Sequence, residues 1–334
     1  MKRLLDKKFL EVEDLVKHYP IFSRGILLKK KIGVIHAVDG ISFSIKKGET
    51  FGLVGESGCG KTTTARTILN LDRPTAGKIC LEGNETGKVF NSRNKKEILK
   101  LRRKMQYVFQ DPYASLDPRM TVADIIIEPF LIHSHIPKEK RLNRLYQLLD
   151  LVGLEDYHAE RYPHEFSGGQ RQRICIARAL AVEPQLLIAD EPVASLDVSV
   201  RAQILNLLQG LQQKLQMTYL YISHDLSTVK HICHRVAVMY LGKIVEMAET
   251  DELFDSPIHP YTQALLSAIP VPDPETKRSR IILPGEIPSP INPPSGCRFQ
   301  PRCIYAKKHG CLEVAQELVD IGNGHLVACA RAKA

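Results

Sequence analysis

Apolar and polar positions along the chain predict strands that alternate with helices. Short continuous apolar runs, such as those at 51–54 and 186–189, are typical of strands buried on both faces. Longer stretches with apolar residues three and four positions apart, such as 198–215, predict helices. We expect strands at residues 9–17, 34–45, 51–54, 78–81, 105–109, 186–189, 218–222 and 235–240. We expect helices at residues 63–71, 121–161, 168–180, 198–215 and 226–233.

This alternation indicates an α/β fold with a parallel core sheet. The segment at 9–17 alternates apolar and polar residues and is expected at a sheet edge. The polar segment at 84–100 is expected to be irregular before it becomes helical. Residues 121–161 indicate a helical insertion between core strands. Prolines are frequent between residues 270 and 295, which indicates a linker or wrapping segment rather than a packed helix.

The composition is ordinary for a globular protein. The 334 residues, 44% hydrophobic and 25% charged, are enough for one large domain and a smaller one. No apolar run approaches the ~18 to 20 residues that span a bilayer, and the first residues lack the apolar core of a secretory signal. We therefore expect a cytoplasmic chain that meets a membrane through a partner or its surface. The net charge of +9 is spread without interleaved aromatics, which favours solvated faces near a membrane over nucleic-acid binding.

A glycine-rich loop carries the strongest chemical signal. Residues 55–62, GESGCGKT, have the phosphate-binding pattern G-x-x-x-x-G-K-[ST] between a predicted strand and a predicted helix. Glycines let the backbone curl around an anion and point N–H groups at it, Lys61 reaches the β- and γ-phosphates, and Thr62 helps to hold Mg²⁺. We interpret the loop as a nucleoside triphosphate site rather than a flexible glycine turn. The residues expected to bind nucleotide here are Gly55, Glu56, Ser57, Gly58, Cys59, Gly60, Lys61, Thr62 and Thr63.

Two acidic residues follow the predicted strand at 186–189. Asp190 and Glu191 lie at its carboxyl end, where open α/β sheets bind ligands. Together with the phosphate loop, this placement predicts that Asp190 holds Mg²⁺ and that Glu191 orients or deprotonates the attacking water. Without the loop, the pair would be typical of a solvated strand end.

A second helix start also suits an anion. Ser167 is a predicted helix cap, and Gly168 and Gly169 follow it, which leaves backbone N–H groups exposed at the helix start. An ordinary capped helix would have the same pattern, so the chemistry alone leaves both readings open.

In their order along the chain, these motifs resemble those of ATP-binding-cassette (ABC) ATPases. Residues 55–63, Gln110, 167–170, 186–191, 194–197 and His224 are similar to the family's Walker A, Q-loop, signature, Walker B, D-loop and switch histidine. The similarity covers about residues 9–250, with Phe166 in place of the usual leucine before the signature serine. The resemblance implies a P-loop NTPase fold of the ABC type, with a parallel core sheet, an antiparallel β subdomain and a helical subdomain at about 112–182.

The resemblance also implies cofactors and roles. ATP and Mg²⁺ would lie between two cassettes arranged head to tail, so that Ser167 and Gly169 contact the γ-phosphate held by the other chain. An aromatic ring after the first strand stacks on adenine in this family, and Tyr19 is the best-placed ring, although plain packing is the alternative. The implied catalytic residues are Glu191 as general base, His224 as a ligand of the γ-phosphate and the water, Lys61, and Gln110 as a magnesium sensor. The remaining implied nucleotide contacts are Gly168, Gln170, Asp190 and Asp197, with Mg²⁺ held through Thr62, Gln110 and Asp190.

Further tracts resemble the ATPases of oligopeptide and dipeptide importers. They lie at 109–119, 161–166, 259–266 and 285–290, and within that family the chain is most similar to the F-type dipeptide permease subunits. The resemblance implies a nucleotide-binding domain at 1–255 and a C-terminal extension at 256–334. It also implies ATP-driven import of peptides at the cytoplasmic membrane face, with nickel or other peptide-like solutes as alternative cargo.

The implied partners are a second, homologous ATPase chain, two membrane-spanning permease subunits and, indirectly, an extracytoplasmic solute-binding protein. The chain itself is not expected to bind the peptide or nucleic acid. The alternative class is a soluble ABC ATPase that acts on nucleic acid or ribosomes. That class usually carries two cassettes or a long coiled-coil insertion, whereas this chain has one cassette and a short helical insertion.

The eight cysteines fall into two groups. Four are scattered singly and are expected to be buried, inert thiols, namely Cys59, Cys80, Cys175 and Cys233. The other four crowd the last forty residues with the spacing C-x₅-C-x₇-C-x₁₇-C, namely Cys297, Cys303, Cys311 and Cys329. A reducing cytoplasm argues against disulfides, and four thiolates can form an iron–sulfur or zinc site. The family resemblance favours a [4Fe–4S] cluster, with zinc and reduced thiols as alternatives.

Overall fold

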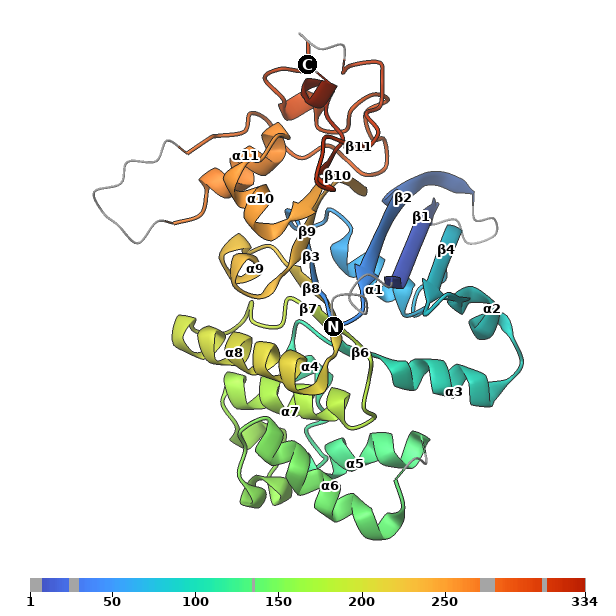
Figure 1. The fold of residues 1–334 in the computed structure, drawn as a ribbon. Helices are drawn as coiled ribbons and strands as arrows, with labels where there is room; N and C mark the ends of the chain where they lie inside the picture. Colours follow the sequence, from blue (N-terminus) through green and yellow to red (C-terminus); the bar gives the residue numbers. More distant parts are fainter. Residues whose placement is uncertain (1–7, 24–29, 134–135, 271–279, 308–310, 334) are drawn as a thin grey trace. The chain divides into compact units, whose positions relative to one another are not determined.

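The computed structural model describes residues 8–23, 30–133, 136–270, 280–307 and 311–333 (Figure 1). The chain divides into two compact units that interleave along the sequence. The first unit comprises Met1–Phe9, Ile45–Thr50 and Leu81–Ile222, and the second comprises Leu10–Ser44, Phe51–Cys80 and Ser223–Ala334. None of the helices in the described residues is both long and apolar enough to cross a membrane. The predicted domain division at residue 255 stays a prediction.

The first unit contains three parallel strands. β7 (Leu186–Asp190) lies between β6 (Met105–Val108) and β8 (Thr218–Ser223) and runs parallel to both. Every residue of β7 and β8 is buried, because central parallel strands are covered on both faces, and their side chains are therefore mostly apolar, with polar residues only at the strand ends. The continuous apolar runs in the sequence thus predicted these strands correctly.

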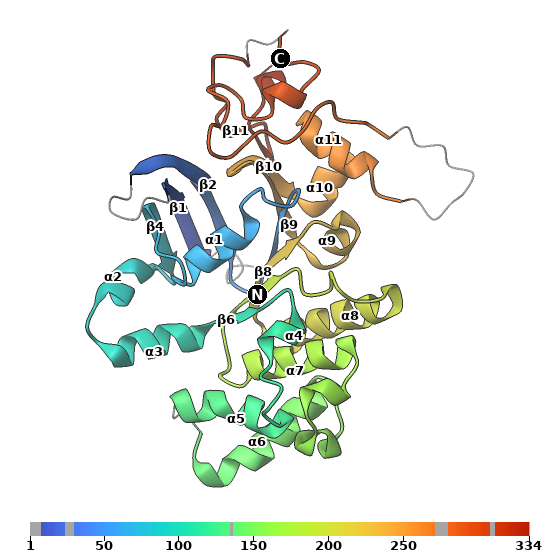
Figure 2. The ribbon, with the colours of Figure 1, turned by 180° about the vertical axis from the view of Figure 1, so that it is seen from behind.

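Helices make up most of the rest of the first unit. Figures 1 and 2 show α5 (Val122–His133), α6 (Lys138–Leu151) and α7 (Gly168–Leu180) packed together. The buried side chains of α5 and α6 recur three and four positions apart, which places them on one face of each helix. The other elements are β5 (Asn84–Glu85), α2 (Thr86–Asn91), α3 (Lys95–Lys104), α4 (Pro112–Ser115), α8 (Val198–Leu215) and 3-10 turns at Asp156–Glu160 and Pro163–Glu165.

The second unit contains most of a sheet that bears the N-terminal strands. β1 (Lys8–Phe22) lies between β2 (Lys31–Lys46) and β4 (Ala76–Leu81), and Figures 1 and 2 show the three side by side. The prediction that 9–17 forms an edge strand is therefore wrong. An alternating pattern indicates one buried face, which interior and edge strands share, so it does not identify an edge.

A second set of strands in this unit carries the phosphate loop. β3 (Thr50–Val54) runs parallel to β9 (Arg235–Tyr240), which pairs antiparallel with β10 (Lys243–Glu249). β10 continues antiparallel to β12 (Leu326–Val327), and β12 to β11 (Val319–Asp320). The helices are α1 (Lys61–Ile68), α9 (Leu226–Ile232), α10 (Thr250–Asp255) and α11 (Pro260–Ser267), with 3-10 turns at Gln300–Arg302 and Ala330–Lys333.

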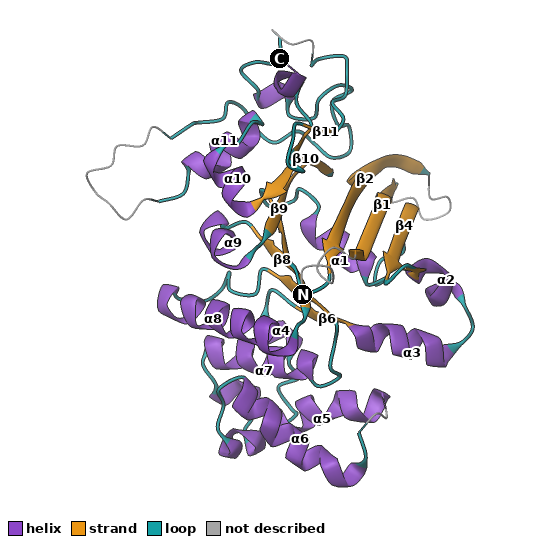
Figure 3. Ribbon diagram, in the orientation of Figure 1, coloured by secondary structure: helices purple, strands orange, loops and turns teal. Residues whose placement is uncertain are grey.

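Three local expectations need correction or extension. The segment at 84–100 is not irregular, because it forms β5, α2 and the start of α3, which Asn94 caps by accepting hydrogen bonds from two backbone N–H groups. α1 begins two residues earlier than predicted, and β10, α10 and α11 were not predicted. Residues 280–295 contain no helix or strand (Figure 3), as the proline content predicted, while 271–279 lie outside the described residues.

Candidate functional site

The phosphate loop connects β3 to α1 (Figure 1). α1 begins at Lys61 with Gly60 as its N-cap. Gly60 has a φ of 113°, and a Cβ atom there would lie 2.2 Å from the carbonyl oxygen of Ala37. Gly55 has a φ of 151°, and a Cβ atom there would lie 2.1 Å from the carbonyl oxygen of Met239. Both positions therefore require glycine, as the phosphate-loop pattern predicts.

Lys61 is folded onto this loop. Its Nζ donates hydrogen bonds to the carbonyl oxygens of Gly55, at 2.7 Å, and Glu56, at 3.1 Å, and the residue is 5% exposed. The neighbouring Thr62 is exposed. An ammonium held by two carbonyl groups can exchange them for phosphate oxygens, with which it forms stronger charge-assisted bonds. The loop thus presents a cation to a phosphate group.

Tyr19 lies beside the same helix start. The sequence predicted that Tyr19 follows the first strand, whereas in the structure Tyr19 is part of that strand, β1. Its hydroxyl interacts with Asp72 and Thr63, and burial together with the Asp72 carboxylate raises the pKa of this hydroxyl. The Nζ of Lys17 lies 4.6 Å from the ring centroid. The contact with Thr63 places the hydroxyl of Tyr19 at the first turn of α1, next to the phosphate loop.

His224 follows β8 directly, and its side chain is exposed. The next residue, Asp225, caps α9 by accepting a hydrogen bond from the N–H of Ser227 at 2.9 Å. The cap fixes where the helix begins. His224 is therefore held at a strand-to-helix turn in the second unit.

Asp190 ends β7 in the first unit. Its carboxylate is 2% exposed and accepts a hydrogen bond from the hydroxyl of Tyr107 on β6. A buried carboxylate requires partners of this kind because its charge has lost water. Sequence reasoning missed Tyr107, because it lies inside a predicted strand and carries no motif. Its pairing partner across the parallel strands is Ile188, and this register is what brings it near Asp190.

Glu191 and Gln110 lie together at the same sheet edge. The Nε2 of Gln110 donates a hydrogen bond to Oε2 of Glu191 at 3.0 Å. The N–H of Glu191 donates to the carbonyl oxygen of Ile222 at 2.9 Å, and Glu191 has a φ of 47°, which side chains rarely adopt. The left-handed backbone conformation of Glu191 follows directly after the end of β7. These two predicted site residues are thus in direct contact.

The segment at 167–170 opens α7 as a capping box. The Oγ of Ser167 accepts from the N–H of Gln170 at 3.3 Å, and Oε1 of Gln170 accepts from the N–H of Ser167 at 3.0 Å. A Cβ atom on Gly169 would lie 2.3 Å from Cγ1 of Val200 on α8, so this position too requires glycine. Ser167 is exposed, and Asp197, which precedes α8, is exposed as well. At the predicted second anion surface, Ser167 is thus exposed, Gly168 and Gln170 are half-buried and Gly169 is buried.

The predicted site residues are divided between the two units. The first unit holds Gln110, 167–170, Asp190, Glu191 and Asp197, and the second holds Tyr19, 55–63 and His224. Within the units, the structure brings together Gln110 and Glu191, and also Tyr19 and Thr63. Sequence reasoning missed Tyr261 and Arg302, which both contact Glu56, because no periodicity links positions so far apart.

The cysteines divide largely as expected. Cys59, Cys175 and Cys233 are buried, and burial raises the pKa of the Cys175 thiol to about 11 and that of the Cys59 thiol above its usual value. The thiols of Cys175 and Cys59 are therefore protonated and unreactive at neutral pH. Cys80 is half-buried, so its expected burial is wrong, because β4 alternates and its neighbour Ile79 takes the inward position.

The four C-terminal thiols influence one another. Burial, then the nearby thiols of Cys311, Cys303 and Cys329, raise the pKa of Cys297 to about 11. The N–H of Cys297 also donates to the carbonyl oxygen of Cys311 at 2.9 Å. Among the described residues, the three-ligand group with donor atoms within 4.8 Å of one another is His18, His36 and Asp39 rather than a set of cysteines. The four thiols are therefore near enough to influence one another, and no three of them, all in the described residues, meet this distance criterion.

Comparison with known proteins identifies two matching families. Residues 38–194 match the family described as "ABC transporter", and residues 245–311 match the family described as "Oligopeptide/dipeptide transporter, C-terminal region". The chain is 52% identical over 322 residues to the oligopeptide transport ATP-binding protein AppF of Bacillus subtilis, covering 96% of each chain. It is 48% identical over 327 residues to the dipeptide transport ATP-binding protein DppF of Escherichia coli, covering 97% of this chain and 95% of DppF.

Solved structures of ABC cassettes share the fold. The structure of cbiO1 from Clostridium perfringens, part of the ABC transporter complex cbiONQ, is 29% identical, with a TM-score of 0.62 over 75% of this chain and 92% of that one. A cassette dimer in a post-hydrolysis state with ADP and Pi is 28% identical, with a TM-score of 0.62 over 72% of this chain and 98% of that one. The predicted ABC-type fold is confirmed.

Proposed function

The chain belongs to the family of ABC transporter ATP-binding proteins, in its oligopeptide and dipeptide branch, and on this premise we propose that it hydrolyses ATP to drive peptide import through a membrane transporter. The observation that carries the proposal is the phosphate loop, in which the buried Lys61 side chain folds back onto a backbone with two positions, Gly55 and Gly60, that require glycine. The peptide cargo is supported by relatives of about half identity over nearly the whole chain.

Each predicted residue has a part in binding and hydrolysis. The loop N–H groups and Lys61 bind the β- and γ-phosphates, and Tyr19 lies against the adenine. Thr62, Asp190 and Gln110 offer the oxygen ligands that Mg²⁺ prefers, and the ion supplies charge neutralisation and alignment of the phosphates. Glu191 accepts a proton from the attacking water while His224 orients the water and the γ-phosphate.

A second cassette completes the site. Ser167 and the N–H groups of Gly168 and Gly169 contact the γ-phosphate held by the other chain, where the helix dipole of α7 favours negative charge. The N–H of Gln170 stays bonded to the Oγ of Ser167. Asp197 lies in the loop between β7 and α8 and faces the same dimer interface. ATP therefore holds two cassettes together, and its hydrolysis lets them separate.

ATPases of this family work as dimers with membrane permeases. We propose that the second cassette is a similar but different chain, that two permease subunits receive the motion through the surface beside Gln110, and that an extracytoplasmic binding protein delivers the peptide. The chain would then lie peripherally on the cytoplasmic face of the membrane. Nickel or another peptide-like solute is the alternative cargo.

Uptake and copurification test the function. Cells that carry Glu191→Gln in place of the natural chain are expected to lose uptake of a labelled dipeptide while the chain accumulates normally. Detergent extracts are expected to yield permease subunits with the tagged chain. Recovery of RNA or ribosomes instead, with dipeptide uptake unchanged, would overturn the proposal in favour of a soluble ABC ATPase.

We also propose that Cys297, Cys303, Cys311 and Cys329 hold a [4Fe–4S] cluster, with zinc as the alternative. The proposal is supported by the resemblance to peptide-importer ATPases and by the gathering of the thiols, since the N–H of Cys297 donates to the carbonyl oxygen of Cys311 at 2.9 Å and four thiolates can ligate such a group. Such a group would stabilise an extension that has little core of its own.

Metal content tests this assignment. Full-length protein purified without oxygen is expected to be brown and to contain iron, and Cys303→Ser is expected to lose both properties. A colourless, iron-free preparation with stoichiometric zinc would reverse the assignment.

A further inference from the structure

Glu56, the first variable residue of the phosphate loop, is bound by the C-terminal extension. Nη1 of Arg302 lies 2.8 Å from Oε2 of Glu56, and Nη2 lies 3.3 Å from Oε1, so the pair is bidentate. The N–H of Glu56 donates to the hydroxyl of Tyr261 at 2.8 Å. All three residues belong to the second unit. The extension therefore contacts both the backbone and the side chain of one loop residue.

The segment that carries Arg302 is rigidly placed. Phe299, three residues earlier, is 1% exposed, and its ring centroid lies 5.5 Å from that of Tyr261 and 5.3 Å from that of Tyr240. The N–H of Arg302 donates to the carbonyl oxygen of Phe299 at 3.0 Å, which closes a 3-10 turn between Cys297 and Cys303. Arg302 itself is 7% exposed. Its guanidinium is thus held at the loop by packing rather than by a flexible arm.

Arg302 offsets the repulsion that the Glu56 carboxylate would exert on a bound triphosphate. A carboxylate in a loop that binds a triphosphate repels the ligand, and the repulsion is strong where water is scarce. The Arg302 guanidinium neutralises this charge at bidentate distance. Burial lowers the pKa of Arg302, but its hydrogen bonds to Glu56 raise this pKa overall. The pair therefore presents no net charge to a bound phosphate.

The contacts of Glu56 with Tyr261 and Arg302 do not involve Lys61. Nζ of Lys61 donates to the carbonyl oxygen of Glu56, and this bond must break when Lys61 turns to the phosphates. The hydroxyl of Tyr261 accepts from the N–H of Glu56, and Arg302 donates to its carboxylate. These bonds need not change when Lys61 leaves the carbonyl oxygen. They can hold the loop in its curled form in both states, so less order has to be gained on binding.

We propose that Arg302 is a positioning residue of the nucleotide site, which neutralises Glu56 and, together with Tyr261, holds the phosphate loop ready for ATP. The C-terminal extension thereby sets the affinity of the loop for ATP, in addition to holding its own cysteines. This inference rests on ATP binding at the loop, which the proposed function includes. It does not depend on which metal, if any, the cysteines hold.

The test measures binding of ATP–Mg²⁺ to the full-length chain by calorimetry. Arg302→Ala is expected to weaken binding about tenfold or more, because it leaves a half-buried carboxylate uncompensated. Arg302→Lys is expected to lose less, since it keeps the charge without the bidentate geometry. The double variant Glu56→Gln with Arg302→Ala is expected to recover most of the affinity. Arg331→Ala is the matched control. Arg331 lies in the same extension with its guanidinium over the ring of Tyr305, and this variant should bind ATP–Mg²⁺ as tightly as the natural chain does.

Two readouts separate positioning from general destabilisation. In steady-state hydrolysis by the assembled transporter, Arg302→Ala should raise KM for ATP and leave kcat nearly unchanged. Tyr261→Phe removes one hydroxyl from a buried ring, and it should weaken ATP binding a few-fold while the chain stays folded. This second variant keeps the test decisive if Arg302→Ala does not fold.

Unchanged ATP affinity in Arg302→Ala would overturn the inference. So would a double variant as weak as Arg302→Ala, because the loss would then not come from the charge of Glu56. If Arg302→Ala is unfolded, unchanged affinity in Tyr261→Phe has the same meaning. A natural chain that binds ATP no better than Lys61→Ala would instead contradict the proposed function, so the two failures are distinguishable.

Discussion

Gln110 donates a hydrogen bond from Nε2 to Oε2 of Glu191, 3.0 Å away, at the edge where two parallel strands of the first unit end. The contact holds one carboxylate oxygen of Glu191 beside the side-chain amide of Gln110. Folding therefore brings together two residues that lie 81 positions apart in the chain.

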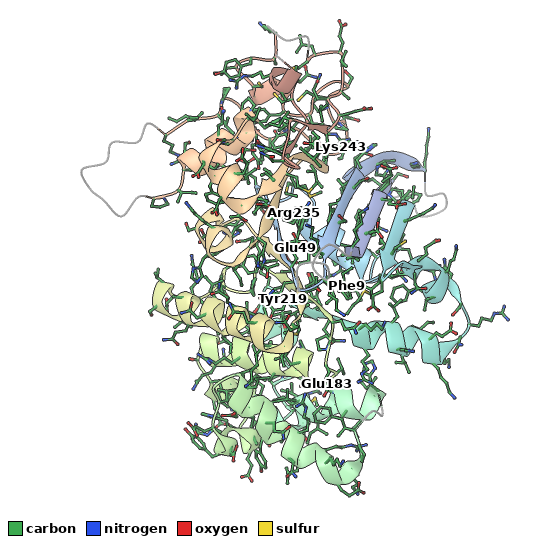
Figure 4. The ribbon with its side chains drawn as sticks, viewed as in Figure 1. Phe9, Glu49, Glu183, Tyr219, Arg235 and Lys243 are labelled. Atoms are coloured by element: carbon green, nitrogen blue, oxygen red, sulfur yellow. The ribbon has the colours of Figure 1, made fainter. Side chains whose placement is uncertain are left out.

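Replacing Glu191 by glutamine is expected to lower ATP turnover at least about 100-fold, because an amide cannot accept the water proton. ATP binding should be retained, since the phosphate loop lies elsewhere in the chain. Turnover and binding are measured on the same preparation. Glu183→Gln is the matched control, because Glu183 (labelled in Figure 4) is an exposed glutamate of the same unit that pairs with Arg144. Near-normal hydrolysis by Glu191→Gln would remove Glu191 from the catalytic role.

Replacing Gln110 by glutamate is expected to shift the acid limb of the pH–rate profile upward by about one unit or more. Two carboxylates about 3 Å apart cannot both ionise easily, so the pKa of the pair rises. The profile of kcat is measured between pH 5.5 and 9. Gln110→Ala, which also removes the hydrogen bond but adds no charge, should reduce turnover without this shift. Identical profiles for the two variants would mean that Gln110 and Glu191 are apart during turnover.

Replacing Gly169 by alanine is expected to destabilise the protein by roughly 1–3 kcal/mol, because the new methyl group would lie 2.3 Å from Cγ1 of Val200. Adding Val200→Ala removes that atom and should restore the thermal midpoint, whereas Val200→Ala alone should have a smaller effect. Turnover gives a second result. If Gly169 contacts a γ-phosphate through its backbone, the double variant regains stability but not turnover, and full recovery of turnover would argue that packing alone requires glycine.

His259 is expected to make stability fall as the pH is lowered. Burial, then the charge of Arg331, lower its pKa from 6.5 to about 3. Above pH 6.5 the imidazole is neutral in both states. Below it the unfolded chain binds a proton that the folded chain does not, so stability is lost by up to about 1.4 kcal/mol per pH unit as the pH falls toward 3.

His259→Asn tests this dependence. Its side-chain oxygen can accept the N–H of Tyr261, as Nδ1 of His259 does at 3.1 Å, so α11 keeps its cap. The thermal midpoint of this variant should fall less between pH 7 and pH 5 than that of the natural chain. His164→Asn, which changes an exposed histidine, is the control and should keep the natural slope. If the thermal midpoints of all three proteins depend equally on pH, His259 can be protonated without destabilising the folded chain.

Local features of this protein follow from its sequence. The roles of Gly55 and Gly60 can be predicted from the sequence because a phosphate-binding backbone needs conformations that other residues avoid. Ser167 can be predicted as a helix cap because its hydrogen-bond partner, Gln170, is only three residues away. The buried parallel strands can be predicted because a strand covered on both faces carries a continuous apolar run, as Leu186–Ala189 does in β7.

The same local reasoning fails where the partner is distant. It placed β1 at a sheet edge, because alternation reports one buried face and nothing about neighbours. It read Tyr107 as an ordinary strand residue, although the register of β6 beside β7 brings its hydroxyl to Asp190.

The sequence by itself determined the phosphate loop, because the loop depends on residues within a few positions of one another, and it determined the family through the order of such local motifs along the chain. Only the tertiary structure decided that Arg302 neutralises Glu56 and that Gln110 orients Glu191. These pairs are separated by 246 and 81 positions. No periodicity of a helix or strand extends that far, so only folding brings their charges together.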